Sequence, residues 1–163
     1  MRDIKYENSD RIFNFRVCGI LIKENKILLN RLKYNNFWTF IGGKVVFGET
    51  TEESIIREYK EEIGINVETN RLVSIVENFF FYRNKKWHEL LYFYLLRDPL
   101  NKLQIFSGTK DILDNSLGEF IWLDIKKLDS IKIQPECSHD ILLSLHSDND
   151  NIKHIIHKDD LKS

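Results

Sequence analysis

The chain has 163 residues, 42% hydrophobic and 12% aromatic, which suffices for one domain whose core needs no disulfide. Its 24 Lys and Arg residues balance 25 Asp and Glu residues, and the net charge of −1 argues against DNA binding or attachment to an anionic membrane. The longest apolar run, 90–96, is shorter than a membrane span, and the charged start is no signal peptide. We therefore expect a cytoplasmic monomer or homodimer with Cys18 and Cys137 as free core thiols.

Hydrophobic periodicity predicts many short strands and few helices. Strand-like runs at 15–22 and 27–32 should form one hairpin, and runs at 72–82 and 88–96 a second, with 102–106 as a candidate third partner. Another strand-like run occupies 119–123. Helical patterns occupy 51–63 and 136–146, and a weaker one lies at 151–157 within a weakly patterned C-terminal tail, 147–163. No linker or repeat divides the sequence, so we expect a single domain over 1–163. This pattern predicts the α+β class, with helices covering a mixed β-sheet.

Local signals define the ends of the helix at 51–63. Thr50, with Glu53 three residues later, forms a capping box, so the helix should begin at Thr51. Gly64 follows the last charged turn and should be the left-handed C-cap. At about 100° per residue, one face carries an apolar stripe made of Ile55, Ile56, Tyr59 and Ile63. We expect this stripe to pack on the core.

Three glutamates, Glu58, Glu61 and Glu62, share a second face of this helix. A solvated surface is the ordinary interpretation of such a face. Here Arg57 and Lys60 are the only cations among six glutamates between residues 49 and 62, and Glu58 with Glu62 is a repulsive i,i+4 pair. Carboxylate oxygens at this spacing are ligands that Mg²⁺ or Mn²⁺ prefers, together with waters and substrate phosphates. The pattern therefore indicates a metal site.

Residues 43–65 resemble the signature of the Nudix (MutT-like) hydrolases. The matching pattern is Gly43, five residues, Glu49, seven residues, Arg57-Glu58-Tyr59, one residue, Glu61-Glu62, one residue and Gly64-Ile65. In layout the resemblance extends over about 10–146, and it implies the family's α/β/α sandwich with a mixed sheet. Two positions depart from the family pattern: Ile41 stands where Pro often precedes the two glycines, and Tyr59 replaces an aliphatic residue. Neither change removes a metal ligand.

The resemblance implies a Mg²⁺- or Mn²⁺-dependent pyrophosphohydrolase that cleaves a diphosphate bond in a nucleoside diphosphate linked to another group. Such chemistry needs a metal because a diphosphate carries crowded negative charge. Glu58, Glu61 and Glu62 would hold the metal, with a backbone carbonyl of Gly42 or Gly43. Arg57 would pair with Glu49 and orient neighbouring carboxylates, because its planar guanidinium can hold two of them.

The resemblance leaves the general base and the substrate contacts open. Glu119, at the entry to a strand, resembles a position that supplies an extra carboxylate in some members, although an exposed Glu there is usually only solvated. Glu89 is the rival and should face the same side as Leu91, toward the site or the core. Trp38 could stack on a nucleobase and His88 could contact phosphate or base, although such strand residues are more often structural.

Two classes of function follow. The first is an enzyme acting on a nucleotide-type small molecule, and we favour free or modified (deoxy)nucleotides over ADP-ribose, dinucleoside polyphosphates and RNA 5′ ends. The second is a non-catalytic nucleotide sensor with the same fold. A retired site would be expected to lose one of the three metal-binding glutamates, and all three are present. The sequence therefore favours the enzyme.

Overall fold

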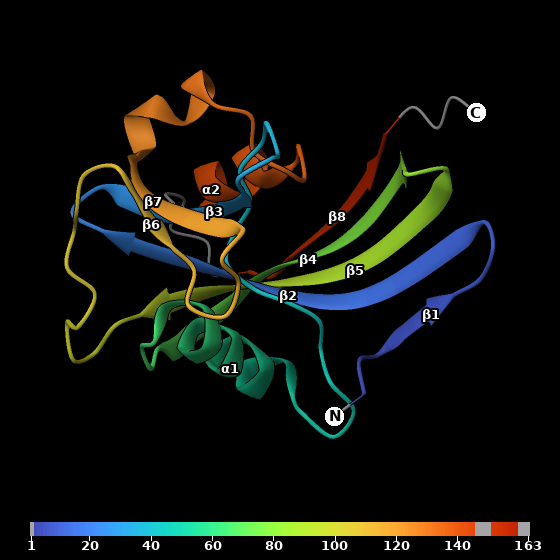
Figure 1. Cartoon of the computed structure of the whole chain (residues 1–163), viewed down its shortest axis with the longest axis horizontal. Coiled ribbons are helices and arrows are strands. Elements are labelled where there is room, and N and C mark those ends of the chain that lie inside the picture. The colour runs from blue at the N-terminus through green and yellow to red at the C-terminus, as the bar shows by residue number, and fades with distance from the viewer. Residues whose placement is uncertain (1, 146–150, 160–163) are drawn as a thin grey trace.

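The computed structural model describes residues 2–145 and 151–159, and a mixed β-sheet forms its centre (Figure 1). The elements are β1 (Lys5–Glu7), β2 (Arg11–Lys23), β3 (Lys26–Leu32), α1 (Thr51–Ile63), β4 (Glu68–Tyr82), β5 (Lys85–Arg97), β6 (Thr109–Asp111), β7 (Gly118–Asp124), the 3₁₀ helix η1 (Ile125–Ser130), α2 (Ser138–Ser144) and β8 (Lys153–Lys158). The strand order is β6-β7-β3-β2-β5-β4-β8, and β1 pairs with β2. Strand β2 is parallel to β5, and β4 is parallel to β8.

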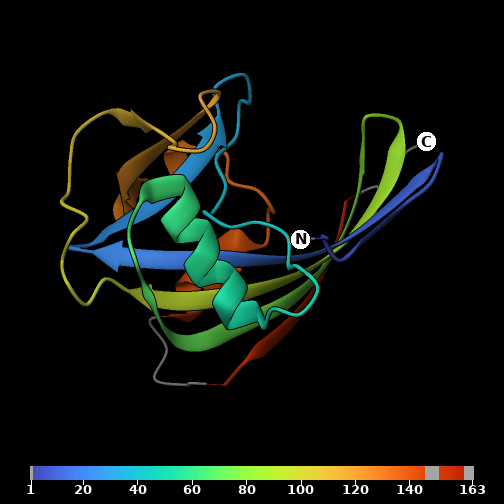
Figure 2. The ribbon, with the colours of Figure 1, turned by 60° about the horizontal axis from the view of Figure 1, so that its bottom comes forward.

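Helices cover both faces of this sheet, as predicted, with α1 on one side and α2 on the other (Figures 1 and 2). Successive residues of a strand point to opposite faces. Val17 of β2 accordingly packs in the core cluster that contains Tyr59 of α1, whereas Cys18 packs in the cluster that contains Ile141 of α2. Cys18 and Cys137 are free and buried, which confirms the prediction of core thiols. None of the helices in the described parts of the chain is long and apolar enough to cross a membrane.

Strands β2 and β3 form the predicted hairpin, but they separate soon after their turn. Their register pairs only Ile22 with Ile27 and Lys23 with Lys26. The loop before α1 enters the opening, with single bridges from Thr39 to Asn30, from Ile41 to Gly19 and from Lys44 to Arg16. The loop thus satisfies backbone groups that the separated strands leave unpaired. It also places Gly42 and Gly43 beside β2.

Helix α1 has the predicted boundaries and caps. The Thr50 hydroxyl accepts from the Glu53 backbone N–H, the Glu53 side chain accepts from the Thr50 N–H, and Gly64 has the left-handed φ of 79°. Tyr59 is fully buried, and its hydroxyl donates to the Gly19 carbonyl at 3.1 Å. A Cβ on Gly19 would overlap the Tyr59 ring. The departure at Tyr59 is therefore a core residue that fits against a glycine.

The predictions for the last third of the chain need three corrections. Residues 102–106 form no strand; Leu103 is buried in a loop, and β6 is the partner that pairs with β7. Helix α2 is shorter than the predicted 136–146. The helix predicted at 151–157 is wrong, because residues 153–158 form β8 along the free edge of β4. Its partly buried Ile155 and His157 alternate with exposed neighbours, a two-residue period. The remainder of the predicted tail, 147–150 and 160–163, lies outside the described residues.

Candidate active site

Two glycines bring the loop before α1 into direct contact with the helix and with β2. Gly42 has a φ of 152°, and a Cβ there would overlap the Val17 carbonyl oxygen. A Cβ on Gly43 would overlap the Glu58 carboxylate. The Gly43 carbonyl, a predicted metal ligand, accepts a hydrogen bond from the Val17 N–H at 2.9 Å, and its second lone pair is left for another partner. Gly42 thus lies against β2, and Gly43 lies against the Glu58 carboxylate.

Arg57 holds three of the predicted glutamates in one network. Its Nε lies 2.9 Å from Glu49 Oε1, and its Nη1 lies 2.7 Å from Glu58 Oε1 and 3.1 Å from Glu61 Oε2. Ser54 also donates to Glu49 at 2.8 Å. The Arg57 hydrogen bonds hold the pKa of Glu49 below its usual value. The structure thus brings together the pair that was expected from sequence and adds Glu58 and Glu61 to it.

Glu62 has a different environment on the same helix. Its Oε2 accepts from the Asn30 Nδ2 at 3.0 Å, and the Thr39 hydroxyl donates to Asn30 Oδ1 at 2.7 Å, which orients the amide. Burial raises the pKa of Glu62 to about 8, and the negative charges of Glu58 and Asp114 add to this effect. Burial also raises the pKa of Glu58. The ionised form is therefore disfavoured at both Glu58 and Glu62.

This donor set fits a divalent cation. A buried carboxylate with a raised pKa gains a compensating charge when a cation replaces its proton. Oxygen ligands suit Mg²⁺ or Mn²⁺. Within the described residues, Glu58, Glu61 and Glu62 do not bring three oxygens within 4.8 Å of one another. Glu61 is 48% exposed, so its side chain can rotate toward an ion held by the other two.

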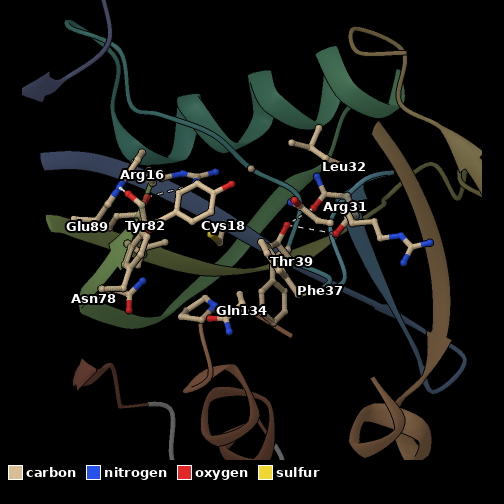
Figure 3. A pocket seen from close by; sticks show the side chains of 18 of the residues that line it. Arg16, Cys18, Arg31, Leu32, Phe37, Thr39, Asn78, Tyr82, Glu89 and Gln134 are labelled. Carbon is tan, nitrogen blue, oxygen red and sulfur yellow. Dashed lines mark hydrogen bonds and ion pairs between the residues drawn. The ribbon is translucent and has the colours of Figure 1, made fainter. Parts of the chain in front are cut away.

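Two cavities meet at this site. The larger has a volume of about 700 Å³ and the smaller about 460 Å³, and Arg16, Gly42, Glu62 and Trp87 line both. Arg16 pairs with Glu89 at 3.5 Å, and among the described residues its buried Nε has no hydrogen-bond partner. Figure 3 shows Arg16 beside Glu89, with Thr39, Phe37 and Gln134 further along the wall. A guanidinium with an unused donor thus lies where the cavities join.

The predicted substrate contacts and base candidates occupy different environments. Glu89 is 6% exposed, faces the same side as Leu91 and lines the larger cavity with it. Trp38 is buried beneath the Arg31 guanidinium, whose carbon lies 4.3 Å from the ring centre. His88 stacks on Phe79, with ring centres 4.2 Å apart. Neither Trp38 nor His88 belongs to the lining of the two cavities.

Glu119 is engaged by an arginine outside the glutamate face. Its Oε1 accepts from both Nε and Nη2 of Arg31 at 2.8 Å, and its side chain is 12% exposed. Arg31 itself lines the larger cavity, whereas Glu119 lines neither. The structure therefore places Glu119 behind Arg31 and away from Glu62.

Sequence reasoning did not select Asp114 or Arg16. Asp114 lines the larger cavity, its charge raises the pKa of Glu62, and the neighbouring Leu113 N–H donates to the Glu62 carbonyl at 2.9 Å. No local signal marks Asp114, because it lies in a polar loop that folding brings to α1. Arg16 carried a signal: it is the one charge within the apolar run at 15–22.

Comparisons with known proteins agree with this geometry. The model of the NUDIX domain family matches residues 13–142. A putative ADP-ribose pyrophosphatase of Bacillus subtilis is 36% identical over 62 residues, 38% of this chain and 30% of that protein. An ADP-ribose pyrophosphatase of Methanocaldococcus jannaschii is 44% identical over 36% of this chain and 37% of its own length. An 8-oxo-dGTP diphosphatase of Buchnera aphidicola is 34% identical over 49% of this chain and 60% of its own length.

These matches span less than two thirds of each of the three relatives. Among solved structures, a MutT protein from Bacillus halodurans aligns with a TM-score of 0.63 at 21% identity, covering 91% of this chain and 93% of that one. A UDP-X diphosphatase aligns with a TM-score of 0.58 at 17% identity over 92% and 68% of the two chains. These structures share the fold, and the family model spans most of this sequence. The chain belongs to the NUDIX domain family.

Proposed function

We propose that this protein is a hydrolase, dependent on Mg²⁺ or Mn²⁺, that cleaves a diphosphate bond in a nucleoside diphosphate derivative. The observation that carries the proposal is Glu62: a partly buried carboxylate beside Glu58, with a pKa raised to about 8, in the lining of both cavities. Its position supports a cation site that faces a substrate-sized space. Cavities of this volume are typical of small-molecule sites.

The glutamates and arginines of the site would have separate roles. Glu58, Glu61 and Glu62 would hold the ion, which when bound neutralises diphosphate charge and acidifies a water. Arg57 keeps Glu58 oriented while its Nε holds Glu49, so it acts as a positioning residue. The Arg16 guanidinium, which lines both cavities, can donate to a phosphate oxygen, because Arg forms strong hydrogen bonds to phosphate.

The geometry supports Asp114 or Glu89 as the group that takes a proton from the attacking water. Both line the larger cavity, which Glu62 also lines. Glu89 is already engaged by Arg16 at 3.5 Å and by the Asn14 amide at 3.4 Å. Asp114 lies close enough to Glu62 for its charge to act on that carboxyl. We propose Asp114 as the base, and Glu119 as a positioning residue for Arg31.

The larger cavity supports a nucleotide as substrate. It joins the phosphate-facing Arg16 to a wall with aromatic and amide groups, among them Phe80, Asn78 and Gln134. Aromatic faces suit a base and amides suit its polar edge. The relatives are named for 8-oxo-dGTP and ADP-ribose. We propose a free or modified nucleotide as the first candidate and ADP-ribose as the second.

A substrate panel tests the proposal. Purified protein with Mg²⁺ or Mn²⁺ is assayed against nucleoside triphosphates, 8-oxo-dGTP, ADP-ribose, diadenosine polyphosphates and 5′-triphosphorylated RNA, with Glu62→Gln as the blank. Metal-dependent cleavage that the variant lacks supports the hydrolase and identifies the substrate class. Saturable nucleotide binding without turnover on any substrate would contradict it and favour the sensor.

A further inference from the structure

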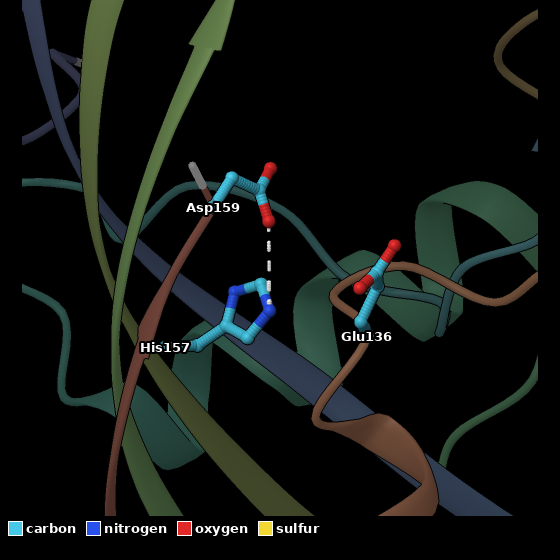
Figure 4. Close-up of side chains that lie close together, drawn as sticks. All are labelled: Glu136, His157 and Asp159. Carbon is cyan, nitrogen blue, oxygen red and sulfur yellow. Dashed lines mark ion pairs between the residues drawn. The ribbon is translucent and has the colours of Figure 1, made fainter. Parts of the chain in front are cut away.

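A second group of potential metal ligands lies away from α1. The side chains of Glu136, His157 and Asp159 bring three ligand atoms within 4.8 Å of one another (Figure 4). It is the only such group of His, Cys, Asp and Glu within residues 2–145 and 151–159. Glu136 precedes α2, whereas His157 lies on β8 and Asp159 directly follows that strand. The group therefore joins two segments that are distant in sequence.

The hydrogen bonds of His157 prepare one ring nitrogen to bind a ligand. Its Nδ1 lies 2.8 Å from Oδ1 of Asn78, a side chain only 6% exposed. Because the amide oxygen accepts, Nδ1 carries the proton and the neutral ring keeps its lone pair on Nε2. That Nε2 lies 3.5 Å from Asp159 Oδ1, and the Glu136 carboxylate is nearby. A histidine held through one nitrogen by a second group is the usual arrangement around a bound metal.

The backbone holds two of the three residues in place. Strand β8 pairs His157 with Asn78 along β4, and the Asp159 N–H donates to the Phe79 carbonyl at 2.9 Å, which continues the pairing beyond β8. Glu136 is exposed, so its carboxylate can adjust toward an ion. The group thus combines two prepositioned ligands with one adaptable ligand.

We propose that Glu136, His157 and Asp159 form a second divalent-cation site, which takes a transition-metal ion such as Zn²⁺ and ties β8 to the segment before α2. One imidazole and two carboxylates match the nitrogen and oxygen ligands of zinc, with a further position for water. Mg²⁺ prefers an all-oxygen set and retains its waters, so this site should reject it. The all-oxygen set of Glu58, Glu61 and Glu62 should have the opposite preference. The two sites therefore differ in ion selectivity.

Calorimetric titration with Zn²⁺ in an excess of Mg²⁺ tests the proposal, because Mg²⁺ occupies the all-oxygen site. We expect one Zn²⁺ per chain for the unmodified protein. His157→Gln should weaken this binding by at least ~100-fold, since loss of a supporting residue alone costs about 10- to 100-fold. His154→Gln is the matched control: His154 lies on the same strand but pairs with Glu77, so Zn²⁺ affinity should be unchanged.

Further variants separate this site from the catalytic proposal and from a misfolded protein. Glu62→Gln should keep the Zn²⁺ site, and Asp159→Asn should weaken it while thermal unfolding without metal stays cooperative. Zn²⁺ should also slow amide hydrogen exchange along β8 in the unmodified protein and not in His157→Gln. Absence of Zn²⁺ binding in excess Mg²⁺, or equal binding by His157→Gln, would overturn the proposal. The contact between His157 and Asp159 would then be only an ion pair.

Discussion

The glutamates on one face of helix α1 have two different electrostatic environments. Glu58 and Glu61 share the Arg57 guanidinium with Glu49, so each carboxylate has a cationic hydrogen-bond partner within the chain. Glu62, one turn on from Glu58, accepts a hydrogen bond from the Asn30 amide, and burial with the negative charges of Glu58 and Asp114 raises its pKa. Arg57 therefore orients Glu58 and Glu61, whereas the charged form of Glu62 would be stabilised by a bound cation. The following experiments test this contrast.

The largest effect is expected from Glu62→Gln. The amide has nearly the same shape but cannot supply a negative charge, so kcat on the substrate found in the panel should fall by about 10³-fold. Glu52→Gln, on an exposed part of α1, is the control and should retain activity. Turnover near the original rate in Glu62→Gln would show that Glu62 is not the essential carboxylate.

Asp114 and Glu119 can be compared directly as base candidates. Asp114→Asn should lower kcat by about 10²-fold, the usual size of a general-base contribution. Glu119→Gln should act through Arg31 and change KM more than kcat. Steady-state kinetics of the two variants across pH separate these roles. A larger loss of kcat in Glu119→Gln would reverse the assignment.

Arg57 should matter for stability as well as rate. Arg57→Ala leaves Glu49 and Glu58 without their shared donor and should lower the free energy of unfolding by about 2–3 kcal/mol. Arg57→Lys keeps the charge but cannot reach all three carboxylates with a planar fork, so an intermediate loss is expected. Urea denaturation of the three proteins measures the effect. Equal stability of the Ala and Lys variants would show that the geometry of the guanidinium is unimportant.

The raised pKa of Glu62 predicts how stability depends on pH without metal. The folded chain holds this proton up to about pH 8, whereas the ordinary carboxyl value is 4.5, so ionisation of Glu62 destabilises the fold progressively between these values. Glu62→Gln should remove this part of the decline and be more stable than the parent above pH 8. Thermal unfolding in a chelator across pH measures it. Parallel curves for the two proteins would contradict the prediction.

The smallest effect concerns the start of α1, remote from the glutamate contrast. Thr50→Ala removes the side chain that accepts from the Glu53 N–H and should cost about 1 kcal/mol of stability while preserving turnover. Thr50→Ser, which keeps the hydroxyl, serves as the control. An unchanged denaturation midpoint in the alanine variant would mean that the cap adds nothing measurable.

Local patterns predicted helix α1 and its caps, the two hairpins and the candidate metal ligands. They failed at β8, because a short segment with alternating Ile and His adopts whichever structure its neighbour offers, and β4 offers a free edge. The resemblance made Glu119 a base candidate, but no local pattern indicated that Arg31, distant in sequence, would bind its carboxylate. Asp114 was not selected from the sequence because Glu62, on which its charge acts, is also distant in sequence. In each case the decisive contact joins segments that are distant in sequence, so a local pattern could not predict it.

The sequence by itself determined the family, the boundaries of α1 and the spacing of its glutamates, since capping and helical geometry depend on residues within a few positions of one another. Only the tertiary structure decided that Glu58 and Glu61 contact Arg57 while Glu62 contacts the Asn30 amide. The pKa of Glu62 depends on burial and on two groups from other segments, the Asn30 amide on β3 and the negative charge of Asp114 in the loop before β7. The electrostatics of a carboxylate are a property of its surroundings, which the folded chain assembles from parts that the sequence keeps apart.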